Sequence, residues 1–161
     1  MAADEEKKSD DRLVKIELDD AGMPRRSAEA EQERAIATYD LLEANIFRLD
    51  DRSGPYHLCL RLEGRHVHFD IREVTDKSLI QFFMAVGPLR RVMRDYFLVC
   101  DTYYDAIRTK SPSQIQAIDM GRRALHNEGS ELLQARLDGK VKTDFQTARR
   151  LFTLICVLHS R

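Results

Sequence analysis

Three polar side chains in the C-terminal half have the spacing of a small acid/base or anion-binding site. Asp119, Arg122 and His126 lie three and four residues apart, so a helix would gather them within about 60° of arc. The apolar stripe of the same helix, marked by Ile115 and Leu125, overlaps or borders this arc. A charge held against apolar neighbours needs a partner, because an unpaired buried charge costs about 3–5 kcal/mol. The three residues therefore form either a functional site or a salt-bridge network that fixes helix packing.

Three pairs of adjacent arginines could extend such a site. The pairs are Arg90-Arg91, Arg122-Arg123 and Arg149-Arg150. Adjacent helical residues point about 100° apart, so one arginine of each pair can turn inward while the other stays in water. If Arg90, Arg122 and Arg149 converge, their guanidinium groups would suit a phosphate or a carboxylate. The alternative is that each pair is solvated and serves internal acids. The predicted anion-binding set is Arg90, Asp119, Arg122, His126 and Arg149, with no catalytic residue assigned.

A second cluster lies on one face of an alternating segment. Cys59, His57, His68 and Asp70 are all residue types that ligate metals, and same-face neighbours in a sheet are close enough to share an ion. No metal-binding spacing motif supports the cluster, which depends on one turn assignment. We therefore predict an ordinary solvated hairpin face, with no metal and no cofactor.

The chain carries none of the motifs that identify several common enzyme classes. A Walker loop, G-x-S-x-G and G-x-G-x-x-G are all absent, and the sequence after His126 is not H-E-x-x-H. No nucleophile stands beside His126 in the sequence. We therefore predict a non-enzymatic interaction or regulatory module. The alternative is a small enzyme or sensor for a phosphorylated or carboxylated metabolite.

RNA binding through the basic half is the weakest alternative. Residues 77–161 hold 14 Lys/Arg and 8 Asp/Glu, a net of +6, whereas residues 1–76 hold 12 and 19, a net of −7. This split indicates either a basic face for an anionic partner or two halves that neutralise each other. Tyr96, Tyr103 and Tyr104 fall on an apolar stripe, whereas single-stranded nucleic acid binding needs exposed aromatics. We therefore expect no nucleic acid partner.

The elements that must position these residues follow from hydrophobic periodicity and helix caps. In the first half we predict a strand Leu13–Leu18, a helix capped by Ser27 with Ile36, Tyr39 and Leu42 inside, a short strand Ile46–Leu49 and a hairpin at about 55–73. The second half begins with a short helix Ser78–Val86, a long helix from Pro88 to Arg108 and a helix from Ser111 to Leu137 with a bend near Asn127–Ser130. It ends with a short strand Lys140–Thr143 and a final helix Phe145–His159. The fold class is α+β. A small antiparallel sheet containing the hairpin is covered on one face by a mostly helical C-terminal half.

The hairpin turn is predicted at Glu63-Gly64, which would place Leu60 opposite Val67. We expect a disordered tail over residues 1–11 and a single domain over residues 12–161. The apolar run Leu151–Leu158 is far shorter than the ~20 residues of a membrane span. It makes the last helix either central or a surface for homo-oligomerisation. Three widely spaced cysteines without C-x-x-C indicate reduced thiols and a cytoplasmic protein that has no membrane partner.

Several runs of the C-terminal half are long and specific. They include Pro-Leu-Arg-Arg-Val-Met-Arg-Asp-Tyr-Phe from Pro88, the run Ala117–Leu133 and the run Thr147–His159. These runs resemble the bacterial uncharacterised protein family (UPF) numbered 0262, and weaker similarity extends back to the first helix. The resemblance implies no activity, cofactor or catalytic residue, so it transfers no site residue to this chain.

Overall fold

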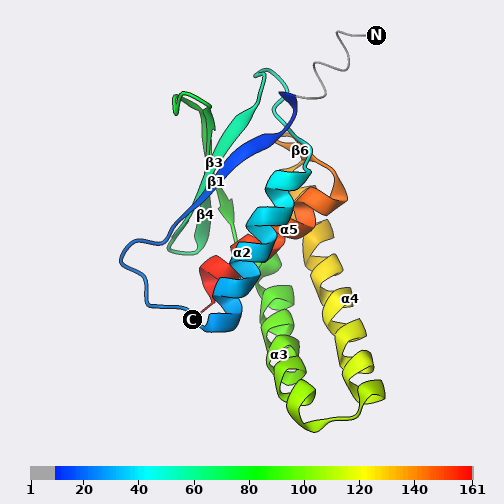
Figure 1. The fold of residues 1–161 in the computed structure, drawn as a ribbon. Helices are drawn as coiled ribbons and strands as arrows, with labels where there is room; N and C mark the ends of the chain where they lie inside the picture. The colour runs from blue at the N-terminus through cyan, green and yellow to red at the C-terminus, as the bar shows by residue number, and fades with distance from the viewer. Residues whose placement is uncertain (1–9, 161) are drawn as a thin grey trace.

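The computed structural model describes residues 10–160, so the predicted disorder of residues 1–9 lies outside it. Over that range the chain forms four helices, a mixed four-stranded sheet and a two-stranded sheet, which confirms the α+β class. The helices are α2 (Ala28–Glu43), α3 (Gly87–Thr109), α4 (Pro112–Leu137) and α5 (Phe145–His159). Helices α2 and α5 lie beside the sheet, and α3 and α4 form a long hairpin that extends away from it (Figure 1).

The main sheet is mixed, whereas the prediction was an antiparallel one. Its strands are β1 (Leu13–Asp19), β3 (Tyr56–Glu63), β4 (His66–Glu73) and β5 (Ser78–Ala85), in the order β1-β3-β4-β5. Strand β1 runs parallel to β3, and the other two pairs are antiparallel. The parallel pair arises because the chain crosses over through α2 between β1 and β3, as parallel neighbours require.

The hairpin of β3 and β4 turns one residue later than predicted. Glu63 pairs with His66, so the turn is Gly64-Arg65, and Gly64 has the positive φ of 61° that tight hairpin turns use. Leu60 therefore faces Phe69, where Val67 was predicted. A register shift of two residues leaves every side chain on its predicted face of the sheet.

The segment 78–85 is strand β5, so the predicted short helix is wrong. Ile80, Phe82 and Met84 alternate along it and face Ile71, Phe69 and Val67 of β4. The rings of Phe69 and Phe82 stack with their centroids 4.9 Å apart. Helical and strand periods both fit so short an apolar run, and the open edge of β4 decides between them.

Three of the helices begin at side chains that bond to their free backbone N–H groups. Ser27 caps α2, Ser111 forms a capping box with Gln114 at the start of α4, and Asp144 caps α5. Helix α4 continues without interruption through the predicted bend. The short strands β2 (Phe47–Arg48) and β6 (Lys142–Thr143) pair with each other, so both were predicted at the right place.

Helix α2 turns a different face inward from the one predicted. Ile36, Tyr39 and Leu42 are exposed by 52%, 66% and 41%, and the buried residues are Ala37 and Leu41. The larger apolar side chains therefore point outward, while the inner face is narrow and small. This rotation of α2 decides which of its acidic residues reach the candidate site.

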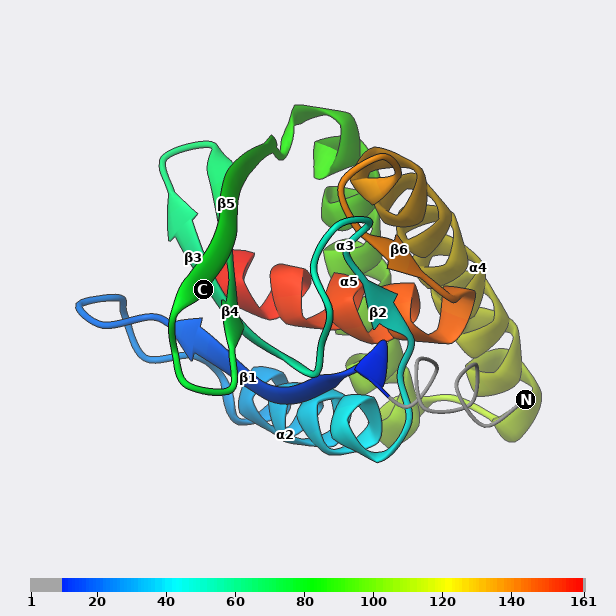
Figure 2. The ribbon, with the colours of Figure 1, turned by 90° about the horizontal axis from the view of Figure 1, so that it is seen from above.

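Helix α5 is the central element of the core, with the sheet, α2 and the α3–α4 hairpin around it (Figure 2). Seven of the eight residues in the run Leu151–Leu158 are buried, and the exception is Thr153. Burial within the chain explains the all-round apolar pattern, so the pattern gives no support to an oligomer interface there. Homo-oligomerisation stays a prediction.

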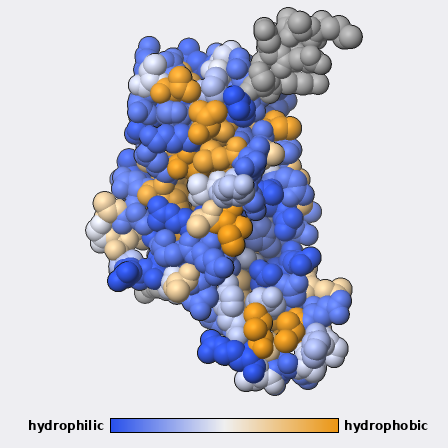
Figure 3. Space-filling view, in the orientation of Figure 1, coloured by the Kyte–Doolittle hydropathy of each residue, from blue (hydrophilic) through white to orange (hydrophobic). Residues whose placement is uncertain are grey.

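The outer surface in the view of Figure 3 is mostly hydrophilic, with apolar areas near the sheet and near the far end of the α3–α4 hairpin. Across residues 10–160, no helix has both the length and the apolar character that crossing a bilayer would need.

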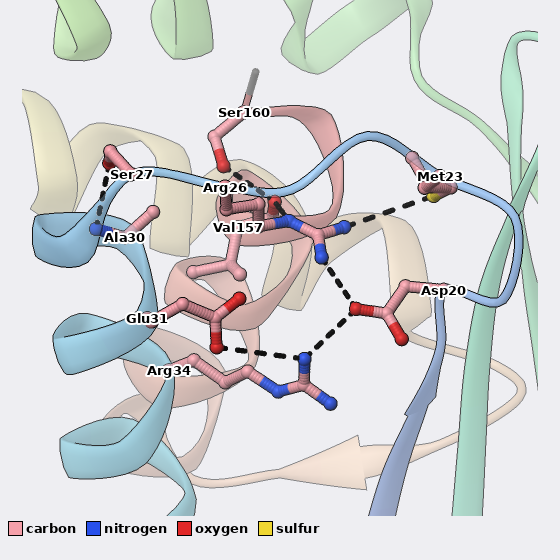
Figure 4. Close-up of polar contacts among 9 residues, drawn as sticks. All are labelled: Asp20, Met23, Arg26, Ser27, Ala30, Glu31, Arg34, Val157 and Ser160. Carbon is pink, nitrogen blue, oxygen red and sulfur yellow. Dashed lines mark hydrogen bonds and ion pairs between the residues drawn. The ribbon is translucent and has the colours of Figure 1, made fainter.

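A buried arginine joins the loop after β1 to the end of α5. The Arg26 side chain is 3% exposed, and its Nε donates to the carbonyl of Val157 at 2.6 Å (Figure 4). Its Nη1 donates to Asp20, also at 2.6 Å, and Arg34 donates to the same carboxylate at 3.0 Å. The last carbonyls of a helix lack intrahelical donors, so Arg26 closes the end of α5. Nothing in the sequence singled out this residue.

Candidate functional site

A cavity of about 440 Å³ lies where α2, α4 and α5 meet, with Tyr96 of α3 in its wall. Its basic and polar lining residues are Arg122, Arg123, His126, Arg149, Arg150 and Thr153. We call this space the arginine cavity. It unites Arg122, His126 and Arg149 of the predicted set. Asp119 does not line the cavity but accepts a hydrogen bond from Arg122, which does. Arg90 lines a different cavity.

Packing between α4 and α5 places His126 at this junction. Its Nε2 is hydrogen-bonded to Thr153 Oγ1 at 2.7 Å, and its ring lies edge-on to Tyr96 and Phe152 at 5.3 and 5.2 Å. Gly129 lets the helices approach, since a Cβ added there would fall 2.2 Å from the Phe152 ring. The sequence marked this contact only indirectly, through the lone polar Thr153 in an apolar run.

The environment of His126 keeps its imidazole uncharged. Burial, together with the charges of Arg149 and Arg122, lowers its pKa from 6.5 to about 4. At neutral pH the ring is therefore a poor proton donor, and it is a weaker base than an ordinary histidine. Acid and base catalysts work best when their pKa is near the working pH. His126 is thus suited to hydrogen bonding more than to proton transfer.

Asp119 fixes the direction of Arg122. Arg122 donates to one Asp119 oxygen from Nη2 at 2.6 Å and from Nε at 3.1 Å, and Arg123 reaches the other oxygen at 3.0 Å. The hydrogen bond from Arg122 leads the effects that lower the pKa of Asp119. The guanidinium of Arg122 also lies 4.6 Å from the centre of the Tyr103 ring. Arg122 is therefore held rigidly at the edge of the cavity.

Arg149 and Arg150 are held differently, with buried donors that lack partners. The Nε atoms of both are buried, and neither has a hydrogen-bond acceptor within residues 10–160. Arg150 does donate from Nη1 to the carbonyl of Gln146 at 3.0 Å. A buried donor that makes no hydrogen bond lowers the free energy of unfolding by about 1–3 kcal/mol, and by more if the group is charged. Arg149 and Arg150 also line the arginine cavity, so with Arg122 and Arg123 they put four arginines around one space.

The acidic residues of the cavity come from α2. Glu33 and Asp40 line it, and Glu33 accepts a hydrogen bond from Tyr104 at 2.9 Å. No ion pair within 4.0 Å joins either of them to the four arginines in the described chain. These acids were missed in the sequence because α2 was predicted with another face inward. The acidic and basic halves of the chain meet here, yet the arginines outnumber the acids that line the space.

The predicted hairpin cluster is occupied by other contacts. Asp70 accepts from Arg72 and Ser78 at 2.8 and 3.1 Å, and His57 bonds to Asp76 at 3.0 Å. In the described residues, no three His, Cys, Asp or Glu side chains are grouped to hold a metal ion. The predicted solvated face is wrong in part: His68 and Asp70 are only 3% and 6% exposed. The unpredicted strand β5 covers them, with Phe83 4.7 Å from the His68 ring.

Comparison with known proteins decides the family. Residues 10–161 match the Uncharacterised protein family (UPF0262). This chain belongs to that family. The UPF0262 protein of Rhodospirillum rubrum is 51% identical over 97% of each chain, and that of Azorhizobium caulinodans is 56% identical over 92% of this chain and 93% of its own. A UPF0262 protein of Paramagnetospirillum magneticum is 53% identical over 93% of this chain and 96% of its own.

No solved structure matches this chain. The UPF0262 relatives match over most of their own length and come from bacteria, so the resemblance seen in the sequence is confirmed. Their names state no ligand, partner or reaction. Function must therefore be argued from the arginine cavity itself.

Proposed function

We propose that this UPF0262 protein is a cytoplasmic, non-enzymatic sensor or regulatory module that binds a small phosphorylated or carboxylated molecule in the arginine cavity. The observation that carries the proposal is the gathering of four arginines, Arg122, Arg123, Arg149 and Arg150, around one cavity that only two acids of the described chain line. Arginine forks match the planar carboxylate and the tetrahedral phosphate better than any other side chain does.

The chemistry of the cavity favours binding over catalysis. His126 is uncharged, and its Nε2 is engaged by Thr153. Asp119 is committed to Arg122 and Arg123. Neither group is free to transfer a proton, whereas the arginines that line the cavity can bind an anion without any chemical step. Glu33 and Asp40 would disfavour a highly charged anion, so a compact ligand with one anionic group fits best.

Thermal denaturation with added anions tests the proposal. The probes are inorganic phosphate, phosphoenolpyruvate and citrate, each titrated against the whole chain at constant ionic strength. A ligand at 100 times its Kd stabilises the folded state by about 2.7 kcal/mol, which raises the Tm by several degrees in a chain of this size. Citrate, with three carboxylates, should stabilise least.

The matched variants are Arg149→Gln with Arg150→Gln, and Arg91→Gln as the control. Arg91 is 89% exposed and does not line the arginine cavity. The double variant should lose the ligand-dependent rise in Tm, while the control keeps it. The proposal is wrong if the double variant retains the full shift, or if wild type responds equally to chloride at the same ionic strength.

A further inference from the structure

A second cavity, larger than the first, lies at the opposite end of α5. Its volume is about 840 Å³, within the usual range of small-molecule sites. It is enclosed by the loop after β1, the turn between β3 and β4, the first turns of α3 and the last residues of α5. We call it the apolar cavity, because its walls include Met23, Leu62, Met93, Phe97, Leu98 and Leu158. Methionine and leucine walls adapt readily to a flexible hydrocarbon.

Three arginines stand around this apolar space. Arg65 comes from the hairpin turn, and Arg90 and Arg94 come from successive turns of α3. All three are exposed, and none forms an ion pair or a side-chain hydrogen bond with another residue of the described range. One carboxylate, Asp101, also lines the cavity. The rim is therefore basic, while the walls are apolar.

The end of α5 adds a polar but uncharged group. His159 Nδ1 is bonded to the carbonyl of Ile155 at 2.8 Å, and burial lowers the pKa of His159 below its ordinary 6.5. The imidazole thus contributes no positive charge at neutral pH. The charge complementarity of the apolar cavity rests on Arg65, Arg90 and Arg94 alone.

We propose that the apolar cavity binds a single-chain aliphatic carboxylate, with its carboxylate at Arg90 and Arg94 and its hydrocarbon against Met93, Phe97 and Leu98. The basic rim beside an apolar wall selects an amphipathic anion. Walls drawn from four separate segments suit a flexible chain that can bend to follow them. Arg90 lies here and not in the arginine cavity, where its sequence pattern predicts it.

Calorimetric titration with decanoate below its critical micelle concentration tests this site. Each buried methylene strengthens binding about fourfold, so octanoate should bind roughly 16 times more weakly than decanoate. Decyltrimethylammonium has a similar chain and the opposite charge, and it should not bind detectably. Equal binding of the two ten-carbon chains would show that the arginines do not select the ligand and would overturn the proposal.

Variants connect the binding to the named residues. Arg90→Gln with Arg94→Gln should weaken decanoate at least tenfold, and Arg91→Gln, at the exposed position between them, should have no effect. Leu98→Asn should weaken decanoate several-fold while circular dichroism stays unchanged, because Leu98 is already 61% exposed. Unaltered affinity in the Arg90/Arg94 double variant would contradict the assignment.

Other occupants have their own signatures. Binding of an acidic leucine-rich peptide without binding of decanoate would assign the cavity to a protein partner. Loss of decanoate binding as the protein dimerises in sedimentation would assign it to a second copy, and both results overturn the proposal. The two sites fail separately: Arg149→Gln with Arg150→Gln should leave decanoate binding unchanged, and phosphate should not compete with decanoate.

Discussion

Arginines lie toward both ends of α5, buried Arg26 at one end and half-buried Arg149 and Arg150 at the other, and they differ in how their donors are used. At the C-terminal end, Arg26 donates to Val157 and Asp20 (Figure 4). A cation there is also favoured by the helix dipole. In the N-terminal half of α5, the Nε donors of Arg149 and Arg150 have no acceptor in the described chain. The helix dipole does not stabilise their positive charges there. The same residue type is a structural link at one end and, in the proposed function, a ligand-binding group at the other.

This contrast suggests a general way to separate the two roles. A structural arginine has its hydrogen-bond acceptors inside the chain, so removing it leaves those acceptors without a donor. An arginine that binds a ligand has donors without acceptors in the free protein. Removing it therefore stabilises the folded state and weakens only ligand binding. Burial alone does not distinguish the two cases, whereas the count of satisfied donors does.

The largest effect is expected at the satisfied end. Arg26→Met should lower the free energy of unfolding by about 3 kcal/mol, because it removes a buried guanidinium that bonds both the Val157 carbonyl and Asp20. Ser160 still donates to that carbonyl, and Arg34 still donates to that carboxylate, so neither acceptor is left entirely unpaired. Urea denaturation followed by circular dichroism measures this loss. The neighbour Arg25 is exposed, so Arg25→Met should change stability by no more than about 0.5 kcal/mol. Similar losses in both variants would break the comparison.

The dependence of stability on pH should separate the two ends next. Folding lowers the pKa of His126 from 6.5 to about 4. Between pH 4 and 6.5 the imidazole is therefore protonated in the unfolded chain and mostly neutral in the folded chain. The contribution of His126 to the free energy of unfolding is therefore fully present above pH 6.5. It falls by about 2–3 kcal/mol as the pH is lowered toward 4. His126→Gln should remove that part of the slope when free energies of unfolding are measured from pH 7 to 4.

At the Arg26 end, the Asp20 carboxylate should respond only in stronger acid, whereas His159, whose pKa burial also lowers, adds to the loss of stability below pH 6.5. Burial alone would raise the pKa of Asp20, but the hydrogen bonds and charges of Arg26 and Arg34 outweigh it and lower that pKa below 3.8. The stabilisation from a lowered carboxyl pKa is present above about pH 4 and is lost as pH falls further. Asp20→Asn should therefore leave the slope between pH 6.5 and 4 unchanged. An Asp20→Asn variant that flattened this region would contradict the assignment to His126.

The fold was predictable where local chemistry decides it. Ser27, Ser111 and Asp144 act as caps as expected, since a cap needs only its own next three residues. Strand β5 was not predictable in this way, because its partner β4 selects strand over helix. The rotation of α2 was also beyond local signals: Ile36 and Tyr39 are its large apolar side chains, yet they face solvent.

The candidate site was predictable in part for the same reason. The i, i+3 and i, i+4 spacing on α4 located Asp119, Arg122 and His126. Convergence with Arg149 needed the packing of α4 on α5, and the place of Arg90 needed the position of α3. Arg26 lies in a loop with no periodicity, so no sequence pattern could separate it from its neighbour Arg25.

Two glycines of α4 test how closely α4 packs on α5 at the helix junction that places His126. A Cβ at Gly129 would fall 2.2 Å from Phe152, whereas a Cβ at Gly121 would meet nothing within 4 Å. Gly129→Ala should thus cost about 2 kcal/mol through overpacking. Gly121→Ala should add about 0.5–1 kcal/mol, because alanine favours the helix. The measurement is chemical denaturation of both variants, and stabilisation by Gly129→Ala would show that α4 and α5 are less closely packed than described.

The smallest change in stability should come from the vacant end, and its sign is what matters. Arg149→Met keeps much of the length of a half-buried side chain and removes a buried Nε donor that has no acceptor in residues 10–160. Removing a buried donor that has no acceptor relieves its desolvation cost, so we expect a gain of about 1 kcal/mol without ligand. The same variant should lose the rise in Tm with inorganic phosphate. Stability and binding would then move in opposite directions at Arg149, whereas Arg26→Met lowers stability alone. Were Arg149→Met as destabilising as Arg26→Met, Arg149 would be a second structural link, and the arginine cavity would lose its claim to a ligand.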